Sequence, residues 1–124
     1  MIGLTRVILR LGRNPDAGFP DGDDNYGYVI QAPLDADGRL DAALWREKKA
    51  QCTVRRFHPR EAAADGWLRL RGETWYFWYD EEDEGPAEPV FKLGTHELRR
   101  GEYLTVREGD GDIVTFRDAE AVRI

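Results

Sequence analysis

The sequence has few of the residues on which several common protein chemistries depend. It contains no serine and a single cysteine, Cys52, which excludes a serine nucleophile and an internal disulfide. No apolar run approaches the length of a membrane span, and Arg6 and Arg10 interrupt the apolar residues at the start of the chain, unlike a signal peptide. These absences predict a cytoplasmic protein with no membrane partner.

Histidine is also scarce, since His58 and His96 are the only two. A zinc site would need both of them with Cys52 or carboxylates, and the ligand spacings typical of zinc are missing. Two acidic stretches begin like calcium loops. One has Tyr26 where the loop needs Gly, and the other has Leu44 where it needs a bidentate Glu. We therefore expect turns at both places, and neither a metal nor another cofactor.

The charge balance is acidic, with a formal net charge of −6 and a pI near 4.9. This charge opposes nonspecific binding to nucleic acid, which is therefore not the expected partner. Four Trp, five Tyr and five Phe argue against disorder, and 124 residues suit a single domain, 1–124. Arginine exceeds lysine by fifteen to three, a bias typical of high-GC genomes.

Alternating apolar residues predict strands over residues 4–11, 26–32 and 51–58, bounded by Gly, Pro and Asp. Residues 12–25 are expected to form a long surface loop. Asp41 is placed to cap a short helix of residues 42–50. Because Leu44 and Trp45 supply most of its apolar face, we expect this helix to lie as a lid on a sheet.

The densest aromatic stretch is Trp75-Tyr76-Phe77-Trp78-Tyr79, and an alternating segment that begins at Trp67 precedes it. Gly72-Glu73 between the two segments supplies a two-residue turn, so residues 67–79 are predicted to form one hairpin. With this turn, Leu70 lies opposite Trp75, Leu68 opposite Phe77, and Trp67 opposite Trp78.

This register divides the hairpin into two faces. The core face consists of Leu68, Leu70, Trp75, Phe77 and Tyr79. The other face, which we name the aromatic–arginine face, consists of Trp67, Arg69, Arg71, Tyr76 and Trp78. Arginine beside Trp and Tyr is typical of interaction hot spots and of platforms for single-stranded nucleic acid. The alternative is that the helix of residues 42–50 and the chain termini cover Trp67 and Trp78.

A second hairpin is predicted over residues 102–117. A three-residue turn, Gly109-Asp110-Gly111, sets Val106 opposite Val114 and Leu104 opposite Phe116. Residues 90–93 are expected to form a short strand, and residues 119–124 a final edge strand. The predicted fold is mainly β: a small antiparallel β-barrel, or a strongly bent sheet or sandwich, of six to eight strands with one short α-helix.

Candidate chemistry lies on the third predicted strand. Cys52, Arg56 and His58 share one of its faces, so a thiolate assisted by the other two is one hypothesis, against a buried cysteine that acts as a small hydrophobe. His96 is expected to join Arg56 and His58 if they line a pocket in the mouth of a barrel. The acidic run of residues 80–84 is interpreted as a solvated loop.

Residues 98–106, Leu-Arg-Arg-Gly-Glu-Tyr-Leu-Thr-Val, resemble a family of small uncharacterised bacterial proteins, and so do residues 115–117, 32–38 and 54–57. The family carries no assigned activity, so the resemblance implies a self-contained bacterial domain and no catalytic residues. Gly101-Glu102-Tyr103 also resembles the barrel entry of flavin reductases. Their flavin-contacting Arg-x-Tyr-Ser pattern is absent here, so no flavin is expected.

The leading hypothesis is therefore a non-enzymatic binding module that contacts another protein through the aromatic–arginine face or the loop of residues 12–25. The alternative is a small enzyme or ligand-binding barrel with its pocket near Arg56, His58 and His96. The sequence sets no oligomeric state.

Overall fold

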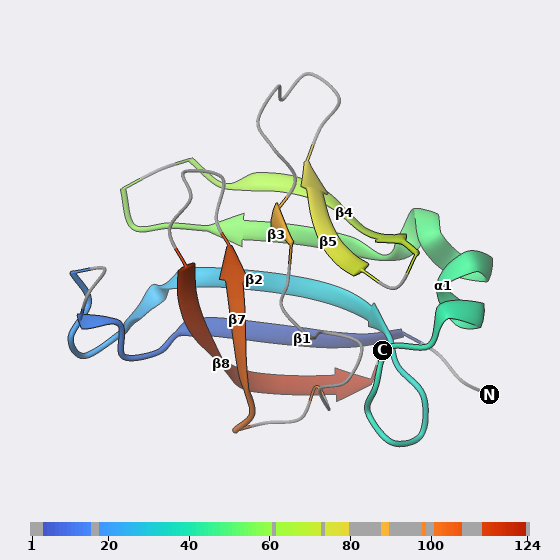
Figure 1. Ribbon diagram of the computed structural model, residues 1–124, viewed down its shortest axis with the longest axis horizontal. Helices are drawn as coiled ribbons and strands as arrows, with labels where there is room; N and C mark the ends of the chain where they lie inside the picture. Colours follow the sequence, from blue (N-terminus) through green and yellow to red (C-terminus); the bar gives the residue numbers. More distant parts are fainter. Residues whose placement is uncertain are drawn as a thin grey trace.

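The computed structural model describes residues 4–15, 18–60, 62–72, 74–79, 88–89, 98, 101–107 and 113–123. Eight strands form a single sheet in which every pairing is antiparallel: β1 (Leu4–Leu11), β2 (Asp23–Pro33), β3 (Thr53–Phe57), β4 (Ala64–Arg71), β5 (Thr74–Tyr79), β6 (Glu88–Pro89), β7 (Tyr103–Arg107) and β8 (Ile113–Arg123). Their order is β6-β5-β4-β3-β2-β1-β8-β7 (Figure 1).

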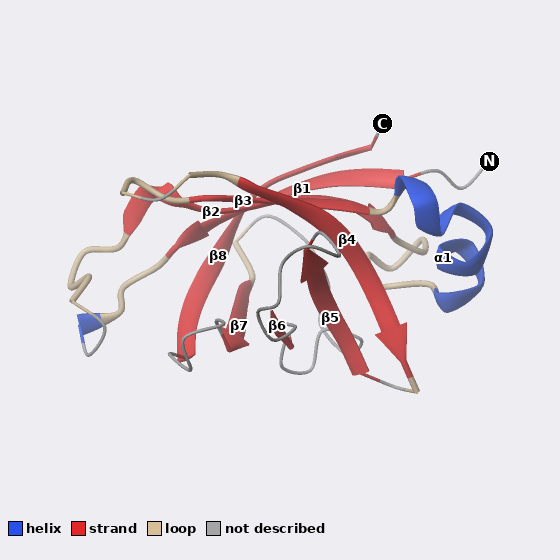
Figure 2. Ribbon diagram, turned by 90° about the horizontal axis from the view of Figure 1, so that it is seen from above, coloured by secondary structure: helices blue, strands red, loops and turns tan. Residues whose placement is uncertain are grey.

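The sheet curls strongly into a half-barrel. In Figure 2, β1, β2 and β3 form its back, β4 and β5 descend on one side, and β8 and β7 descend on the other. Twisted strands curl in this way when one face must enclose all the large apolar side chains of a small domain. The prediction of a mainly β fold with a strongly bent antiparallel sheet and one short helix is confirmed.

The core lies inside the curl, where aromatic rings from distant strands meet. The Tyr28 ring on β2 lies 4.9 Å from that of Phe77 on β5 and 5.1 Å from that of Phe116 on β8, measured between centroids. All three side chains are fully buried. The two descending sides of the sheet are therefore joined through Tyr28.

The single α-helix among the described residues covers one end of the curl (Figure 1). It is α1 (Ala42–Lys48), and a 3₁₀ turn, η2 (Lys49–Gln51), extends it. Asp41 caps it as predicted, because its Oδ1 accepts hydrogen bonds from the amides of Ala43 and Leu44 at 3.0 and 3.2 Å. Trp45 is buried, and its Nε1 donates to the Leu68 carbonyl at 2.8 Å. The helix is anchored chiefly by this one residue.

Both hairpins have the predicted registers. In the first, Leu70 pairs with Trp75, Leu68 with Phe77, and Trp67 with Trp78. In the second, Val106 pairs with Val114 and Leu104 with Phe116. Gly72 takes a φ of 61° at the first turn, a conformation that favours glycine. The second turn, at residues 108–112, lies outside the described residues.

Residues 119–123 are in a strand, as predicted, but they continue β8 and are not an element of their own. Among the described residues β7 pairs with residues 113–117 of β8, while residues 120–123 pair with β1. The register with β1 shifts between Ile8 and Leu9, so Ala119 is an extra residue in β8. The shift reverses the inside–outside alternation, which is why Val122 is 44% exposed and does not join the core.

The segment between β1 and β2 is more ordered than a free surface loop. β2 begins at Asp23, three residues earlier than predicted, and Asn14 bridges to Phe19. The Asn14 side chain also donates to the Thr115 carbonyl at 2.9 Å and accepts from the Thr115 amide at 2.9 Å. These bonds tie the segment to β8.

The predicted strand over residues 90–93 lies outside the described residues, while the short strand β6 pairs with Tyr76 and Phe77. None of the helices in the described part of the chain is long and apolar enough to cross a bilayer.

Candidate functional site

The aromatic–arginine face is built as a ladder on the outer side of the β4–β5 hairpin. The Trp67 and Trp78 rings lie 5.9 Å apart at an interplanar angle of 37°. The guanidinium carbon of Arg69 lies 4.8 Å from the centroid of Trp78, and that of Arg71 lies 5.9 Å from that of Tyr76. The predicted cation–π pairs are therefore present.

This ladder is open to a partner. Trp67, Tyr76 and Trp78 are partly exposed, and Arg71 is exposed. The helix α1 leaves Trp67 and Trp78 partly exposed. It packs through Trp45 against Trp75, which points inward from the same hairpin. Those two rings meet edge to face at 5.9 Å. The end of the chain does not cover Trp67 or Trp78 either, as far as Arg123, since that residue pairs with Thr5 on β1.

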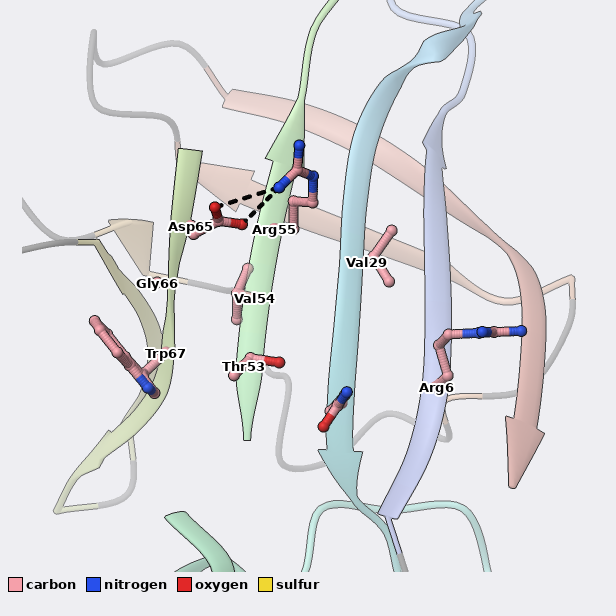
Figure 3. Close-up of a pocket in the computed structure, with 9 residues that line it drawn as sticks. Arg6, Val29, Thr53, Val54, Arg55, Asp65, Gly66 and Trp67 are labelled. Carbon is pink, nitrogen blue, oxygen red and sulfur yellow. Dashed lines mark hydrogen bonds and ion pairs between the residues drawn. The ribbon is translucent and has the colours of Figure 1, made fainter. Parts of the chain in front are cut away.

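A groove continues the ladder across the outer face of the sheet. It has a volume of about 370 Å³, and its lining comes from four neighbouring strands: Arg6 on β1, Val29 and Gln31 on β2, Thr53, Val54 and Arg55 on β3, and Asp65, Gly66 and Trp67 on β4. Figure 3 shows Trp67 at one side of the groove and Arg6 at the other. Trp67 therefore belongs to both the groove and the ladder.

Strand register explains why these side chains line up. Arg6 pairs with Gln31, Val29 with Arg55, and Thr53 with Trp67, so all of them project from the outer face. Arg55 also pairs with Asp65, and its Nη1 lies 3.0 and 3.2 Å from the two carboxylate oxygens. This ion pair fixes one end of the groove (dashed lines in Figure 3).

The second predicted cluster forms in part, around Tyr26 and away from the helix. Arg56 Nη2 donates to the Tyr26 hydroxyl at 3.2 Å, and the His58 ring lies 4.4 Å from the Tyr26 ring. His58 Nδ1 accepts the amide of Arg60 at 3.0 Å. Arg56 and His58 are therefore brought together, with Arg56 Nη2 and His58 Nδ1 hydrogen-bonded within the protein. The third member, His96, lies outside the described residues.

The hypothesis of a Cys52 thiolate is wrong. Cys52 is fully buried, and its Sγ donates to the Lys48 carbonyl at 3.4 Å. Burial raises the pKa of this thiol to about 11, although the nearby charge of Lys48 lowers it in part. The group is therefore protonated at neutral pH and acts as a small buried hydrophobe.

Of the two acidic stretches that begin like calcium loops, the first turns at Asp21 and runs into β2 from Asp23, and the second forms a turn. The Asp23 side chain accepts the Asn25 amide at 2.8 Å. Asp35 Oδ1 accepts the amides of Asp37 and Arg39 at 2.9 and 3.0 Å. Both are the local hydrogen bonds that Asp makes in turns. Within the described ranges, no group of three His, Cys, Asp or Glu side chains is placed to hold a metal ion.

One buried charged residue was missed by the sequence reasoning. Asp118 is fully buried, and neither carboxylate oxygen makes a hydrogen bond that meets normal geometry within the described part of the chain. Its backbone is held in place, since the amide donates to the Glu102 carbonyl at 2.7 Å. Burial raises the pKa of this carboxyl to about 6; the Glu120 amide opposes the shift and the charge of Glu102 adds to it.

Ionisation of the Asp118 carboxyl group should lower the free energy of unfolding as the pH rises. The pKa is about 6 in the folded protein against 3.8 for a free carboxyl, so the folded state holds the proton more tightly. Between pH 5 and pH 7 its ionisation should remove roughly 1 kcal/mol of unfolding free energy. Asp118→Asn should abolish this component, as measured by urea titrations at the two pH values. An unchanged difference between pH 5 and pH 7 in the variant would contradict the assignment.

Comparison with known proteins finds no matching family model, curated protein or solved structure.

Proposed function

We propose that this protein is a non-enzymatic interaction module that binds another protein through its aromatic–arginine face. The observation that carries the proposal is the stacking of Arg69 on Trp78, next to the Trp67 ring, on an open face of the sheet. Planar groups held in this way lose little conformational freedom on binding, and Trp, Tyr and Arg dominate the energetics of protein interfaces.

The internal packing supports this assignment. The inner side of the same hairpin already supplies the core through Phe77, Trp75 and Leu68, which are all buried. The outer rings are therefore not needed to close the core. An exposed cluster of Trp, Tyr and Arg on one rigid hairpin is the arrangement expected of a binding surface.

A pull-down from native lysate tests the proposal. Arg69→Glu reverses the charge over Trp78 and should abolish the capture of at least one protein that the wild type retains. Arg46→Glu is the matched control, because Arg46 is an exposed arginine on α1, away from this face. If both variants capture the same proteins as the wild type, the face is not the binding surface.

The alternative function, a small enzyme or ligand-binding domain, draws support from the cluster of Arg56 and His58 on Tyr26. We favour the interaction module because Arg56 Nη2 and His58 Nδ1 are already hydrogen-bonded within the protein. A cytoplasmic location and a bacterial origin are further predictions of the sequence.

A further inference from the structure

The outer face differs in charge from the rest of the chain. Among the described residues, the groove and the aromatic–arginine face carry Arg6, Arg55, Arg69 and Arg71, with Asp65 and, beside Arg6, Glu120 as their acidic residues. These charges sum to +2 on a chain whose formal net charge is −6. A surface of this sign attracts an acidic partner.

The arginines differ in how fully they are already paired. Arg55 contacts both carboxylate oxygens of Asp65, at 3.0 and 3.2 Å. Arg6 lies 3.7 Å from one oxygen of Glu120, beyond hydrogen-bond distance, so its partner holds it less closely. Arg69 and Arg71 form no ion pair within the described ranges and face the rings of Trp78 and Tyr76. Positive charge is thus left on both sides of Trp67.

Between these charges the groove offers an apolar slot. Its floor includes Val29 and Thr53, and the Trp67 indole forms one side. A volume of about 370 Å³ accommodates a large side chain together with part of its backbone.

We infer that the partner presents an acidic segment with an aromatic or large aliphatic anchor, which enters the groove beside Trp67 while flanking carboxylates meet Arg6 on one side and Arg69 and Arg71 on the other. This inference rests on the proposed function and specifies the partner's chemistry. Arg6 donates charge-assisted hydrogen bonds to a carboxylate of the partner. Arg69 can donate to a second carboxylate while it remains stacked on Trp78, because the face and the edge of a guanidinium make separate contacts.

Single-stranded nucleic acid is the competing occupant of a surface with Trp and Arg. The net charge of −6 opposes the densely charged phosphate backbone of nucleic acid more strongly than a peptide segment with a few carboxylates. A peptide carboxylate of limited charge fits better, because the arginines are spaced around one apolar slot and do not form a continuous basic track.

Selection from a random-sequence peptide display library tests the inference. The wild type should enrich peptides with Glu or Asp around an aromatic or large aliphatic residue, and Arg46→Glu should enrich the same peptides. Arg6→Glu and Trp67→Ala should each raise the Kd for a synthetic peptide from the selection roughly tenfold or more. Thermal melting checks that both variants are folded. Arg6→Glu keeps the test valid if Trp67→Ala proves unstable, since Arg6 is exposed.

The other outcomes separate the inference from the proposed function. If the enriched peptides are neutral or basic but their binding still requires Trp67 and Arg69, the inference of an acidic partner is wrong and the proposed interaction face stands. If no enriched peptide depends on Arg6, Trp67 or Arg69, both are wrong. If an oligothymidylate binds more tightly than the selected peptide, and Arg69→Glu abolishes that binding, the face is a nucleic acid site and the peptide inference is overturned.

Discussion

Phe77→Ala should remove a large part of the free energy that keeps the chain folded. Phe77 is fully buried at the centre of β5, and its ring lies 4.9 Å from that of Tyr28, through which the two sides of the curl are joined. Removing a buried Phe side chain costs about 3–5 kcal/mol, against a total stability of about 5–15 kcal/mol for a typical domain. Thermal melting followed by circular dichroism measures the loss.

Trp78→Ala is the control for this prediction, because Trp78 is the next residue on the same strand and points outward. It loses the ring contact with Trp67 and the cation–π contact with Arg69, together worth about 1–2 kcal/mol. The variant should stay folded with a lowered melting temperature. If Trp78→Ala destabilised the protein as much as Phe77→Ala, the division of the hairpin into a core face and an open face would be wrong.

Gly27→Ala should also destabilise the protein severely. A Cβ on Gly27 would lie 1.8 Å from the Leu9 carbonyl oxygen and 2.9 Å from the Phe57 ring. Gly27 pairs with Arg10 on β1 and Phe57 on β3, so these strands would have to separate where they now approach closely. Overpacking against backbone should cost about 3 kcal/mol or more of unfolding free energy, as measured by urea titration.

Gly12→Ala is the matched control for this effect. A Cβ there would meet the Thr115 carbonyl oxygen at 3.4 Å, which is ordinary contact, and Gly12 has no positive φ. Its stability should match that of the wild type within about 0.5 kcal/mol. Equal stability of both alanine variants would contradict the close approach of β1, β2 and β3 at Gly27.

Local pattern was enough to predict the hairpins because their registers depend on neighbouring residues. Once Gly72 and Glu73 are assigned to a two-residue turn, every pair from Leu70 and Trp75 onward follows. The cap at Asp41 was predictable for the same reason, since its hydrogen bonds reach only to Ala43 and Leu44.

The groove could not be predicted in this way because its lining comes from four strands. Arg6 and Trp67 are distant in sequence, and they line one site only because β1, β2, β3 and β4 lie side by side. Asp118 was missed for a different reason: it lies on the inward face of β8 with Val114 and Phe116, but a charged side chain is rarely buried without a partner. Strand order and bulges depend on the whole fold.

Site-specific photocrosslinking tests the central claim, that the outer face of the hairpin is the binding surface, most directly. A benzophenone side chain at Thr74, which is exposed opposite Arg71, adds a probe next to the ladder without removing any of its members. The control position is Ala43, exposed on α1. We expect the probe at Thr74 to crosslink to a partner that the probe at Ala43 does not capture. This crosslink should be lost when Arg69→Glu is added. A partner that crosslinks from Ala43 and not from Thr74 would contradict the claim.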